Sequence, residues 1–518
     1  ESDPARPGVI GLRKWLPLVL VLLAGTSLTM AYAPFDLWLI TPVALVVALR
    51  QLLLTDTPKK AFWLGWTFGL GWFGAGISWV HVSIADFGGM PLIASVLMMF
   101  LLSAYLALFP AFSFYFAKRW VKPALLPLLL PAIWFIAEWL RSWLLSGFPW
   151  LSLGYSQLDS PLSGWLPVLG ETGMTWLLMT MVSALAVATL SKQFLQDIAI
   201  TGSVTIAALL LNTVNWVEPQ QPVSIGMAQG NIAQSLRWVP EQDAPTMNTY
   251  RELTNLVWDN DVIIWPEAAI PKLEMLAQDF ITDMNAEAAR YDTAIITGVV
   301  NYNFESQEAW NNLIVLGKSH ADDEQGHYRY FHGNRYAKHH LLPIGEFVPF
   351  EDLLRPLAPL FDLPMSSFSR GDFQQPNLLA NGLHLAPAIC FEIAFPRQVR
   401  ANLYADTDFI ITVSNDAWFG RSHGPAQHLQ IARMRAKELG IGVIRSTNNG
   451  ISAFIDHRGK VVAQLPQFET AALSAKLSTV SGSTPYRQWG DFPLWLLTGL
   501  TGLVFLILKL RERGAQSN

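Results

Sequence analysis

Residues 385–392 read LAPAICFE, an apolar run that ends in a cysteine and a glutamate. A short apolar run of this kind, bounded by turn-forming residues, is typical of a buried β-strand. In layered α/β domains the reactive groups gather just beyond the ends of such strands, and Cys390 stands at that position. The chain contains one cysteine, so an internal disulfide is excluded and any thiol chemistry must use Cys390.

Further strand-like runs surround this one between residues 222 and 480. They are 223–227, 262–265, 294–300, 313–316, 409–413, 443–446 and 452–455. Helical patterns lie between some of them, at 245–258, 274–290, 396–404 and 425–439. Alternating strands and helices predict a layered α/β domain, and the segment is long enough for a single domain with a full core.

The rest of the chain has the composition of a membrane protein. Of its 518 residues 51% are hydrophobic and 14% charged, well below the roughly 25% charged residues of soluble domains. Stretches that approach the ~20 residues needed to cross a bilayer are 15–32, 36–54, 61–81, 91–117, 124–143, 165–190, 198–216 and 492–508. The net charge of −5 gives no indication of nucleic-acid binding.

The basic clusters outside the α/β segment fall in alternate loops. They are Arg6, Arg13, Lys14, Arg50, Lys59, Lys60, Lys118, Arg119, Lys122, Lys192, Lys509, Arg511 and Arg513. The intervening loops at 33–35 and 82–90 have no lysine or arginine, and the loop at 144–164 has only Arg141 at its edge. Because cytoplasmic loops are rich in Lys and Arg, we expect both termini in the cytoplasm and residues 222–480 on the opposite face.

Three groups next to apolar runs form a coherent catalytic set: Glu267, Lys338 and Cys390. Alone, each is more often structural, as a helix-start carboxylate, a surface lysine or a small buried side chain. Together, a carboxylate can take the thiol proton, the thiolate can attack a carbonyl, and an ammonium can stabilise the oxyanion. No Gly-rich phosphate loop or metal-ligand spacing occurs in the sequence, so we expect no cofactor and no metal.

The motifs that contain these groups resemble the nitrilase superfamily. They are WPE at 265–267, KHHLLPIGE at 338–346 and CFE at 390–392, with QGNIAQ at 229–234 followed by Trp238, and SNDAWF at 414–419. With eight spans around the domain, the chain is similar to the membrane-integrated branch of the superfamily, the apolipoprotein N-acyltransferases. The resemblance covers essentially the whole chain.

The resemblance implies an α/β fold, an αββα sandwich on the extracytoplasmic side, inserted in an eight-helix transmembrane bundle. The expected parts are seven transmembrane helices in 1–217, the catalytic domain in 218–485, and a last helix with a cytoplasmic tail in 486–518. The implied site residues are Cys390 as nucleophile, Glu267 as general base and acid, Lys338 as oxyanion stabiliser, Glu346 and Glu392 as supporting residues, and Trp238 and Phe391 as substrate-binding residues. Relatives often have tyrosine at the position of Phe391, so a role for a phenol hydroxyl does not transfer.

The implied reaction has two stages in the bacterial inner membrane. A phospholipid donates an acyl chain to Cys390, and the thioester then passes it to the amine of a diacylated apolipoprotein. Two alternatives stay open: a membrane-tethered amidase that hydrolyses a carbon–nitrogen bond, and a transporter with an extracytoplasmic domain. We also expect an apolar lid at 353–368, and a pair between Glu138 and Arg141, which is either functional or a structural salt bridge.

Overall fold

The computed structural model describes residues 7–87, 89–192, 194–343, 345–347, 350–354, 356 and 367–516. The chain forms two compact units. One contains the residues up to His81, Leu92–Val214, and those from Gln488 onward; the other contains Val82–Pro91 and Asn215–Arg487. The segment Val82–Pro91, which interrupts the apolar stretches of the sequence, therefore packs with the α/β part. Its Ser83 hydroxyl donates a hydrogen bond to the carbonyl of Trp418, at 2.7 Å.

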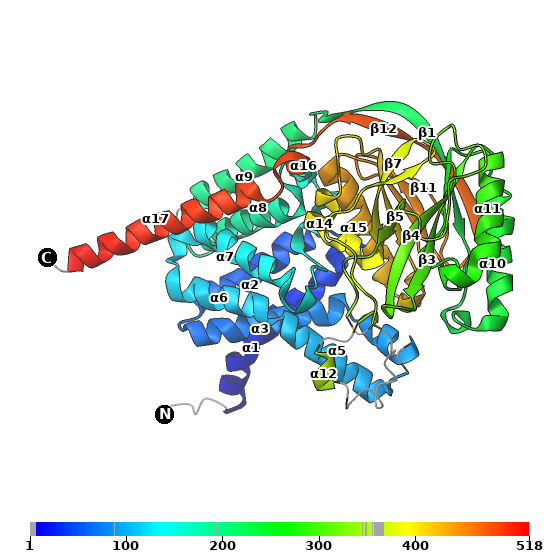
Figure 1. Ribbon diagram of the computed structural model, residues 1–518. Helices are drawn as coiled ribbons and strands as arrows, with labels where there is room; N and C mark the ends of the chain where they lie inside the picture. The colour runs from blue at the N-terminus through cyan, green and yellow to red at the C-terminus, as the bar shows by residue number, and fades with distance from the viewer. Residues whose placement is uncertain are drawn as a thin grey trace. The chain divides into compact units, whose positions relative to one another are not determined.

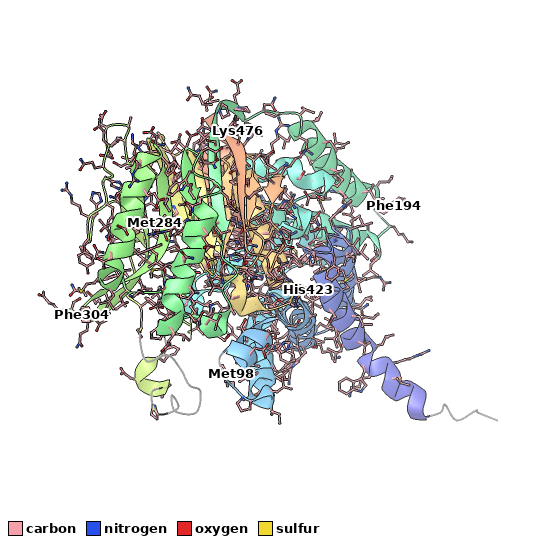
Figure 2. All side chains as sticks on the ribbon, turned by 90° about the vertical axis from the view of Figure 1, so that its right-hand side faces the viewer. Met98, Phe194, Met284, Phe304, His423 and Lys476 are labelled. Atoms are coloured by element: carbon pink, nitrogen blue, oxygen red, sulfur yellow. The ribbon has the colours of Figure 1, made fainter. Side chains whose placement is uncertain are left out.

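The first unit is helical (Figure 1). Its main helices are α1 (Pro7–Ser27), α2 (Ile40–Leu54), α3 (Pro58–Gly76), α5 (Leu92–Leu106), α6 (Leu108–Trp120), α7 (Leu126–Arg141), α8 (Leu166–Ala188), α9 (Phe194–Leu211) and α17 (Phe492–Gln516). In Figure 2, Met98 marks α5 and Phe194 marks the start of α9. Each apolar stretch of the sequence overlaps at least one of these helices.

Six helical stretches among the described residues are long and apolar enough to cross a membrane. A bent pair, Pro58–Gly76 with Val80–Asp86, counts as a seventh if it is a single span, and α2, with 15 residues, is shorter. A helix rises 1.5 Å per residue, so 15 residues fall short of a hydrocarbon core of about 30 Å. The structure thus supports a membrane bundle, and the number of eight crossings stays a prediction.

A buried ion pair organises the interior of this unit. Arg141, which is 1% exposed, donates from Nη2 to Glu138 Oε2 at 2.5 Å. Its Nη1 donates to the carbonyls of Phe148 and Trp150, at 2.8 and 2.6 Å, and Ser152 completes the cluster through a bond to the same carboxylate oxygen. The predicted pair therefore forms, and it holds the irregular chain that follows α7.

Two six-stranded sheets make up the second unit. The first contains β1 (Val217–Gln229), β2 (Val262–Ile264), β3 (Ala294–Asn303), β4 (Glu308–Gly317), β5 (Arg335–Ala337) and β12 (Ala471–Gly482), in the order β12-β1-β2-β3-β4-β5. The second contains β6 (Leu378–Ala380), β7 (Leu383–Ile389), β8 (Phe409–Ser414), β9 (Val443–Thr447), β10 (Ala453–Ile455) and β11 (Val461–Gln464), in the order β11-β10-β9-β8-β7-β6. The middle strands of each sheet, β1-β2-β3 and β7-β8-β9, run parallel.

The sheets pack face to face, with helices on their outer sides (Figure 1). Fully buried aliphatic side chains from both sheets, such as Ile264 and Ile411, share one core. A second core joins the outer face of the first sheet to α10 (Pro240–Thr254) and α11 (Gln278–Arg290). In Figure 2, Met284 marks α11, and Lys476 marks β12. On the second sheet, α14 (Pro396–Ala401) contacts β7 and α15 (Gly424–Leu439) contacts β9, which confirms the predicted α/β sandwich.

The sequence located the strands better than the ends of the helices. Each predicted strand run overlaps an observed strand, but α10 begins at Pro240, earlier than the predicted 245. Proline fits the first turn of a helix, and Glu241 and Asp243 favour the positive end of its dipole. The predicted helix at 396–404 ends at Ala401. Strands β5, β6, β11 and β12 were not predicted.

Candidate active site

Glu267 reaches the site from a loop that begins just after β2. This loop lies against β3, where Gly298 donates to the Pro266 carbonyl at 3.2 Å and Ile270 donates to the Gly298 carbonyl at 3.2 Å. A Cβ at Gly298 would lie 2.1 Å from the backbone nitrogen of Ala268, so only glycine allows this approach. The Glu267 carboxylate accepts a hydrogen bond from the Asn415 backbone N–H, at 3.1 Å.

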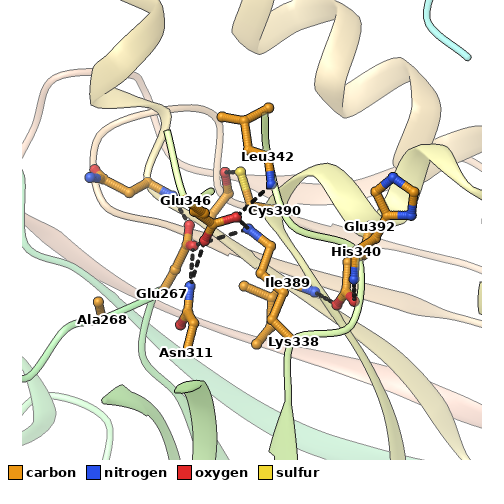
Figure 3. Close-up of polar contacts among 12 residues, drawn as sticks. Glu267, Ala268, Asn311, Lys338, His340, Leu342, Glu346, Ile389, Cys390 and Glu392 are labelled. Carbon is orange, nitrogen blue, oxygen red and sulfur yellow. Dashed lines mark hydrogen bonds and ion pairs between the residues drawn. The ribbon is translucent and has the colours of Figure 1, made fainter. Parts of the chain in front are cut away.

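Lys338 follows β5 and points into a cage of acceptors. Its Nζ lies 2.8 Å from Glu346 Oε2 and 3.6 Å from Glu267 Oε1. Asn311 of β4 bridges the two carboxylates, because its Nδ2 lies 2.9 Å from Glu267 Oε1 and 3.1 Å from Glu346 Oε1. The Leu342 N–H also donates to Glu346, at 2.8 Å. Figure 3 shows these side chains meeting beside Cys390.

Cys390 is the first residue after β7 and begins the short helix η10 (Cys390–Ala394). Its φ is +53°, a left-handed conformation that L-residues rarely adopt and that is found at functional sites. The Ser414 hydroxyl lies 3.4 Å from Sγ. The structure therefore brings together Glu267, Lys338 and Cys390, which are distant in the sequence.

Burial is the main reason that the Cys390 thiol favours its protonated form. Burial, followed by the Glu267 carboxylate, raises the pKa of the Cys390 thiol to about 12, against the opposing charge of Lys338. Burial disfavours the charge on Lys338, but the carboxylates of Glu346 and Glu267 outweigh it and raise the pKa of the ammonium above its usual value. A neutral thiol beside a carboxylate and a permanent cation needs a base at the moment of attack.

Glu392 is a structural anchor of the site. It is fully buried, and its carboxylate accepts hydrogen bonds from the N–H groups of Ile389, His339 and His340, each at 2.8 or 2.9 Å. The Tyr336 hydroxyl also bonds to it, as does the amide of Gln398. These bonds tie the chain after Lys338 to the turn that contains Cys390, since a buried carboxylate is stable only with such donors.

Trp238 lies at the surface near the site. It is 52% exposed and has a φ of +65°. Its neighbour Arg237 donates from Nη2 to the carbonyls of Glu267 and Ala268, at 3.3 and 3.4 Å. Leu236 and Arg237 line a small pocket beside Glu267. The loop is thus near the Glu267 carboxylate, and substrate binding by Trp238 stays a prediction.

Phe391 packs into an aromatic cluster. Its ring centroid lies 5.0 Å from that of Phe395 and 5.8 Å from that of His340, both edge-on. The rings of His340 and Phe395 stack on each other at 3.5 Å. Only 5% of Phe391 is exposed, so the ring supports the turn after Cys390, and its predicted contact with substrate is not tested by this packing.

The sequence interpretation missed Asn311. The residue is 5% exposed and stands in the apolar strand β4, where a polar side chain requires a partner. The pair Asn311-Asn312 at the head of the apolar run 313–316 was a signal that could have identified it. The motif at 414–419 was noted, but the backbone contact of Asn415 with Glu267 was not foreseen.

Two other expectations concern metal binding and the lid. Among the residues that the structure describes, no group of three or more His, Cys, Asp or Glu side chains could hold a metal ion. The predicted lid at 353–368 falls largely outside the described residues, and this includes its apolar members Leu357, Leu360, Phe361, Leu363 and Met365. The lid therefore stays a prediction.

Comparisons with known proteins identify the family of the chain. The family profile described as "Apolipoprotein N-acyltransferase N-terminal domain" matches residues 24–185, and the profile described as "Carbon-nitrogen hydrolase" matches residues 224–486. An apolipoprotein N-acyltransferase of Vibrio parahaemolyticus is 48% identical over 484 residues, which cover 92% of this chain and 94% of that protein. The chain belongs to the apolipoprotein N-acyltransferase family.

Further members of the apolipoprotein N-acyltransferase family are similar over the same length. Relatives of that name from Photobacterium profundum and Methylococcus capsulatus are 45% and 36% identical. The alignments cover 96% and 97% of this chain, and 96% and 97% of the relatives. Among solved structures, Saccharomyces cerevisiae Nit3 of the nitrilase superfamily aligns with a TM-score of 0.37 at 14% identity, covering 50% of this chain and 91% of that one. The resemblance inferred from the motifs is confirmed by the relatives and the two profiles.

Proposed function

We propose that the protein is an apolipoprotein N-acyltransferase. It moves an acyl chain from a membrane phospholipid to Cys390, and then to the N-terminal amine of the S-diacylglyceryl cysteine of an apolipoprotein. The observation that carries the proposal is the grouping of the chain's single thiol with the Lys338 ammonium and the Glu267 carboxylate, in a chain of this family. We assign an enzymatic role to these residues because each supplies one requirement of acyl transfer.

In the first stage Glu267 acts as the base. It takes the proton of the Cys390 thiol as the sulfur attacks the ester carbonyl of the phospholipid. Lys338 lies beside Glu267 and stabilises the negative charge that forms on the carbonyl oxygen. The protonated Glu267 then donates its proton to the departing glycerol oxygen, which leaves a thioester on Cys390 and releases a lysophospholipid.

In the second stage the amine of the apolipoprotein attacks the thioester. Glu267 takes the proton from the amine, and the thiolate of Cys390 leaves and is protonated again. An amide replaces the thioester, so the reaction runs downhill. Glu346 holds Lys338 through the contact of 2.8 Å, which leaves the ammonium in place while Glu267 changes its charge.

We place the reaction at the outer face of a bacterial inner membrane. The eight apolar stretches and the basic residues of alternate loops support eight crossings, with both termini cytoplasmic and the domain of residues 218–485 periplasmic. Both lipid substrates keep their acyl chains in the bilayer, so a membrane-integrated enzyme can meet them there. This arrangement also favours the amine over water, because a shielded thioester survives until the acceptor arrives.

A transfer assay with the purified full-length protein tests the proposal. The donor is phosphatidylethanolamine with labelled acyl chains in mixed micelles. The acceptor is a synthetic lipopeptide whose N-terminal cysteine bears a diacylglyceryl thioether and a free amine. We expect the lipopeptide to gain the mass of one acyl chain and the donor to yield lysophospholipid, with loss of both products in Cys390→Ser.

A lipopeptide with an acetylated amine is the matched control. It should gain no acyl chain, because it has no nucleophile for the second stage. Labelled free fatty acid as the main product with either peptide would instead indicate an amidase-like hydrolase. Transfer by Cys390→Ser at the wild-type rate would contradict the thioester route.

A further inference from the structure

A buried cluster of polar residues contacts Cys390. It consists of Ser414 at the end of β8, Asp416 after it, His428 of α15 and Arg445 of β9. None of the four is more than 1% exposed. We call these residues the Asp416 cluster. The catalytic scheme above does not use them, although burying charged groups at this density is costly unless they are paired.

The cluster contacts Cys390 at two separate atoms. The Ser414 hydroxyl lies 3.4 Å from Sγ, and Nε2 of His428 lies 3.0 Å from the Cys390 carbonyl oxygen. Because a carbonyl oxygen can only accept, His428 is the donor of this second bond. One contact therefore acts on the thiol and the other on the main chain of the nucleophile.

Both contacts lead back to one carboxylate oxygen. Ser414 Oγ donates to Oδ1 of Asp416 at 2.5 Å. Nδ1 of His428 lies 3.2 Å from the same Oδ1, and since Nε2 donates to Cys390, a hydrogen bond from Nδ1 to this carboxylate requires the doubly protonated ring. The second oxygen, Oδ2, accepts a hydrogen bond from Nη2 of Arg445 at 2.5 Å. Asp416 thus joins the partner of the thiol to the partner of the carbonyl.

Asp416 is itself held in place as a carboxylate. Burial favours its neutral form, but the charge of Arg445 and the contact with His428 outweigh burial and lower the pKa of Asp416 to about 2. Glycine at position 450 leaves room for the Asp416 carboxylate, because the Cβ of any other residue there would lie 2.3 Å from Oδ2. The cluster is therefore a rigid, charge-compensated support.

Cys390 needs such a support. Its φ of +53° is unfavourable for any residue with a side chain, and it persists only where the surroundings determine it. The direction of the Cys390 carbonyl follows from this conformation, and the His428 bond holds that carbonyl. A change in this main-chain conformation would move Sγ relative to Glu267.

We propose that Asp416, acting through Ser414 and His428, is the positioning carboxylate of Cys390. It holds the thiol and the main chain of the nucleophile in the left-handed conformation from which Sγ attacks the donor. The inference rests on the proposed role of Cys390. Asp416 and His428 are positioning residues here, because the carbonyl and thiol of Cys390, and not a substrate, are what the cluster contacts.

Two variants of His428 test the contacts of its two ring nitrogens independently. In His428→Gln the amide nitrogen stands near the place of Nε2, so the bond to the Cys390 carbonyl is kept. In His428→Asn the amide nitrogen of the shorter side chain stands near the place of Nδ1. The contact with Asp416 is therefore kept, and the contact with the Cys390 carbonyl is lost. Met434→Ala is the control, because Met434 is fully buried on the same helix, and its truncation should lower stability without reaching Cys390.

The readouts are the rate of alkylation of the single thiol by iodoacetamide and the rate of acylation by labelled phosphatidylethanolamine. Intact-protein mass follows both rates, and thermal unfolding of each variant is measured beside them. We expect His428→Asn to slow both rates by about 10-fold, the factor of one hydrogen bond. His428→Gln should restore them, and Met434→Ala should lower the melting temperature with unchanged rates.

Two results would overturn the proposal. One is alkylation and acylation at the wild-type rate in His428→Asn. The other is a slowing in Met434→Ala that follows its loss of stability, because the cluster would then act only on folding. Alkylation needs no lipid, so slow alkylation in His428→Asn together with a wild type that takes no acyl chain would support the positioning role while rejecting the proposed transferase.

Discussion

Replacing Asn311 by alanine tests how the two carboxylates of the site are held. The Asn311 amide donates to Glu267 at 2.9 Å and to Glu346 at 3.1 Å. A hydrogen bond to a charged group contributes about 1.5–3 kcal/mol. If this hydrogen bond orients the Glu267 carboxylate toward the Cys390 thiol, removing it should lower the acylation rate about 10- to 100-fold.

The assay is a single-turnover measurement of the acyl adduct on Cys390. Asn312→Ala is the matched control, because Asn312 is the next residue of the same strand, is 2% exposed, and its side chain points to the opposite face. Both variants remove a buried amide, so their stability losses should be similar. Equal acylation rates in Asn311→Ala and the wild type would refute the reasoning. An equal fall in the acylation rate of Asn311→Ala and Asn312→Ala would refute it as well.

Three further predictions concern buried charges. Glu392→Gln places an amide N–H against backbone N–H donors, so we expect a loss of about 2–3 kcal/mol in the free energy of unfolding, measured by denaturant titration. The pKa of Asp416 is lowered from 3.8 to about 2, so its stabilisation is fully present above pH 3.8 and is lost as the pH falls toward 2. This corresponds to about 2 kcal/mol, and acid unfolding of Asp416→Asn should lack this step. In the helical unit, Arg141→Met leaves Glu138 buried without its partner and should cost about 3–5 kcal/mol in thermal or detergent unfolding, most of it recovered when Glu138→Leu is added.

Two members of the triad, Glu267 and Cys390, were predictable because each stands directly after an apolar run. Cys390 follows the run that becomes β7, and Glu267 follows the run that becomes β2. Lys338 follows the three-residue strand β5, which has too few residues for a periodic signal, so only its motif identified it. Local patterns and short motifs therefore sufficed to select the three residues to which we assign the chemistry.

The supports of the triad could not be predicted in this way. The Asp416 cluster joins residues from 414 to 445, and its geometry depends on β7, β8 and β9 lying side by side in parallel. Nothing in the local sequence of Asp416 or His428 indicates that they meet at Cys390. Asn311 could have been predicted more easily, because two asparagines interrupt an apolar strand.

Tertiary pairing also explains the missed strand β12. Its sequence, AALSAKLSTVSG, is rich in small and polar residues, which are weak strand formers. It becomes a strand because it pairs with β1 over nearly its full length.

The packing of Val82–Pro91 with the α/β unit also depends on tertiary contacts. The contact of Ser83 with Trp418 joins residues more than three hundred positions apart.

The mass of the intact protein after incubation with phosphatidylethanolamine alone tests the central claim most directly. We predict one added acyl chain, located on Cys390 by peptide mapping, released by hydroxylamine, and absent in Cys390→Ser. The lysophospholipid should appear in equal amount. An adduct of the same size on Cys390→Ser, or on any other residue of the wild type, would contradict the account.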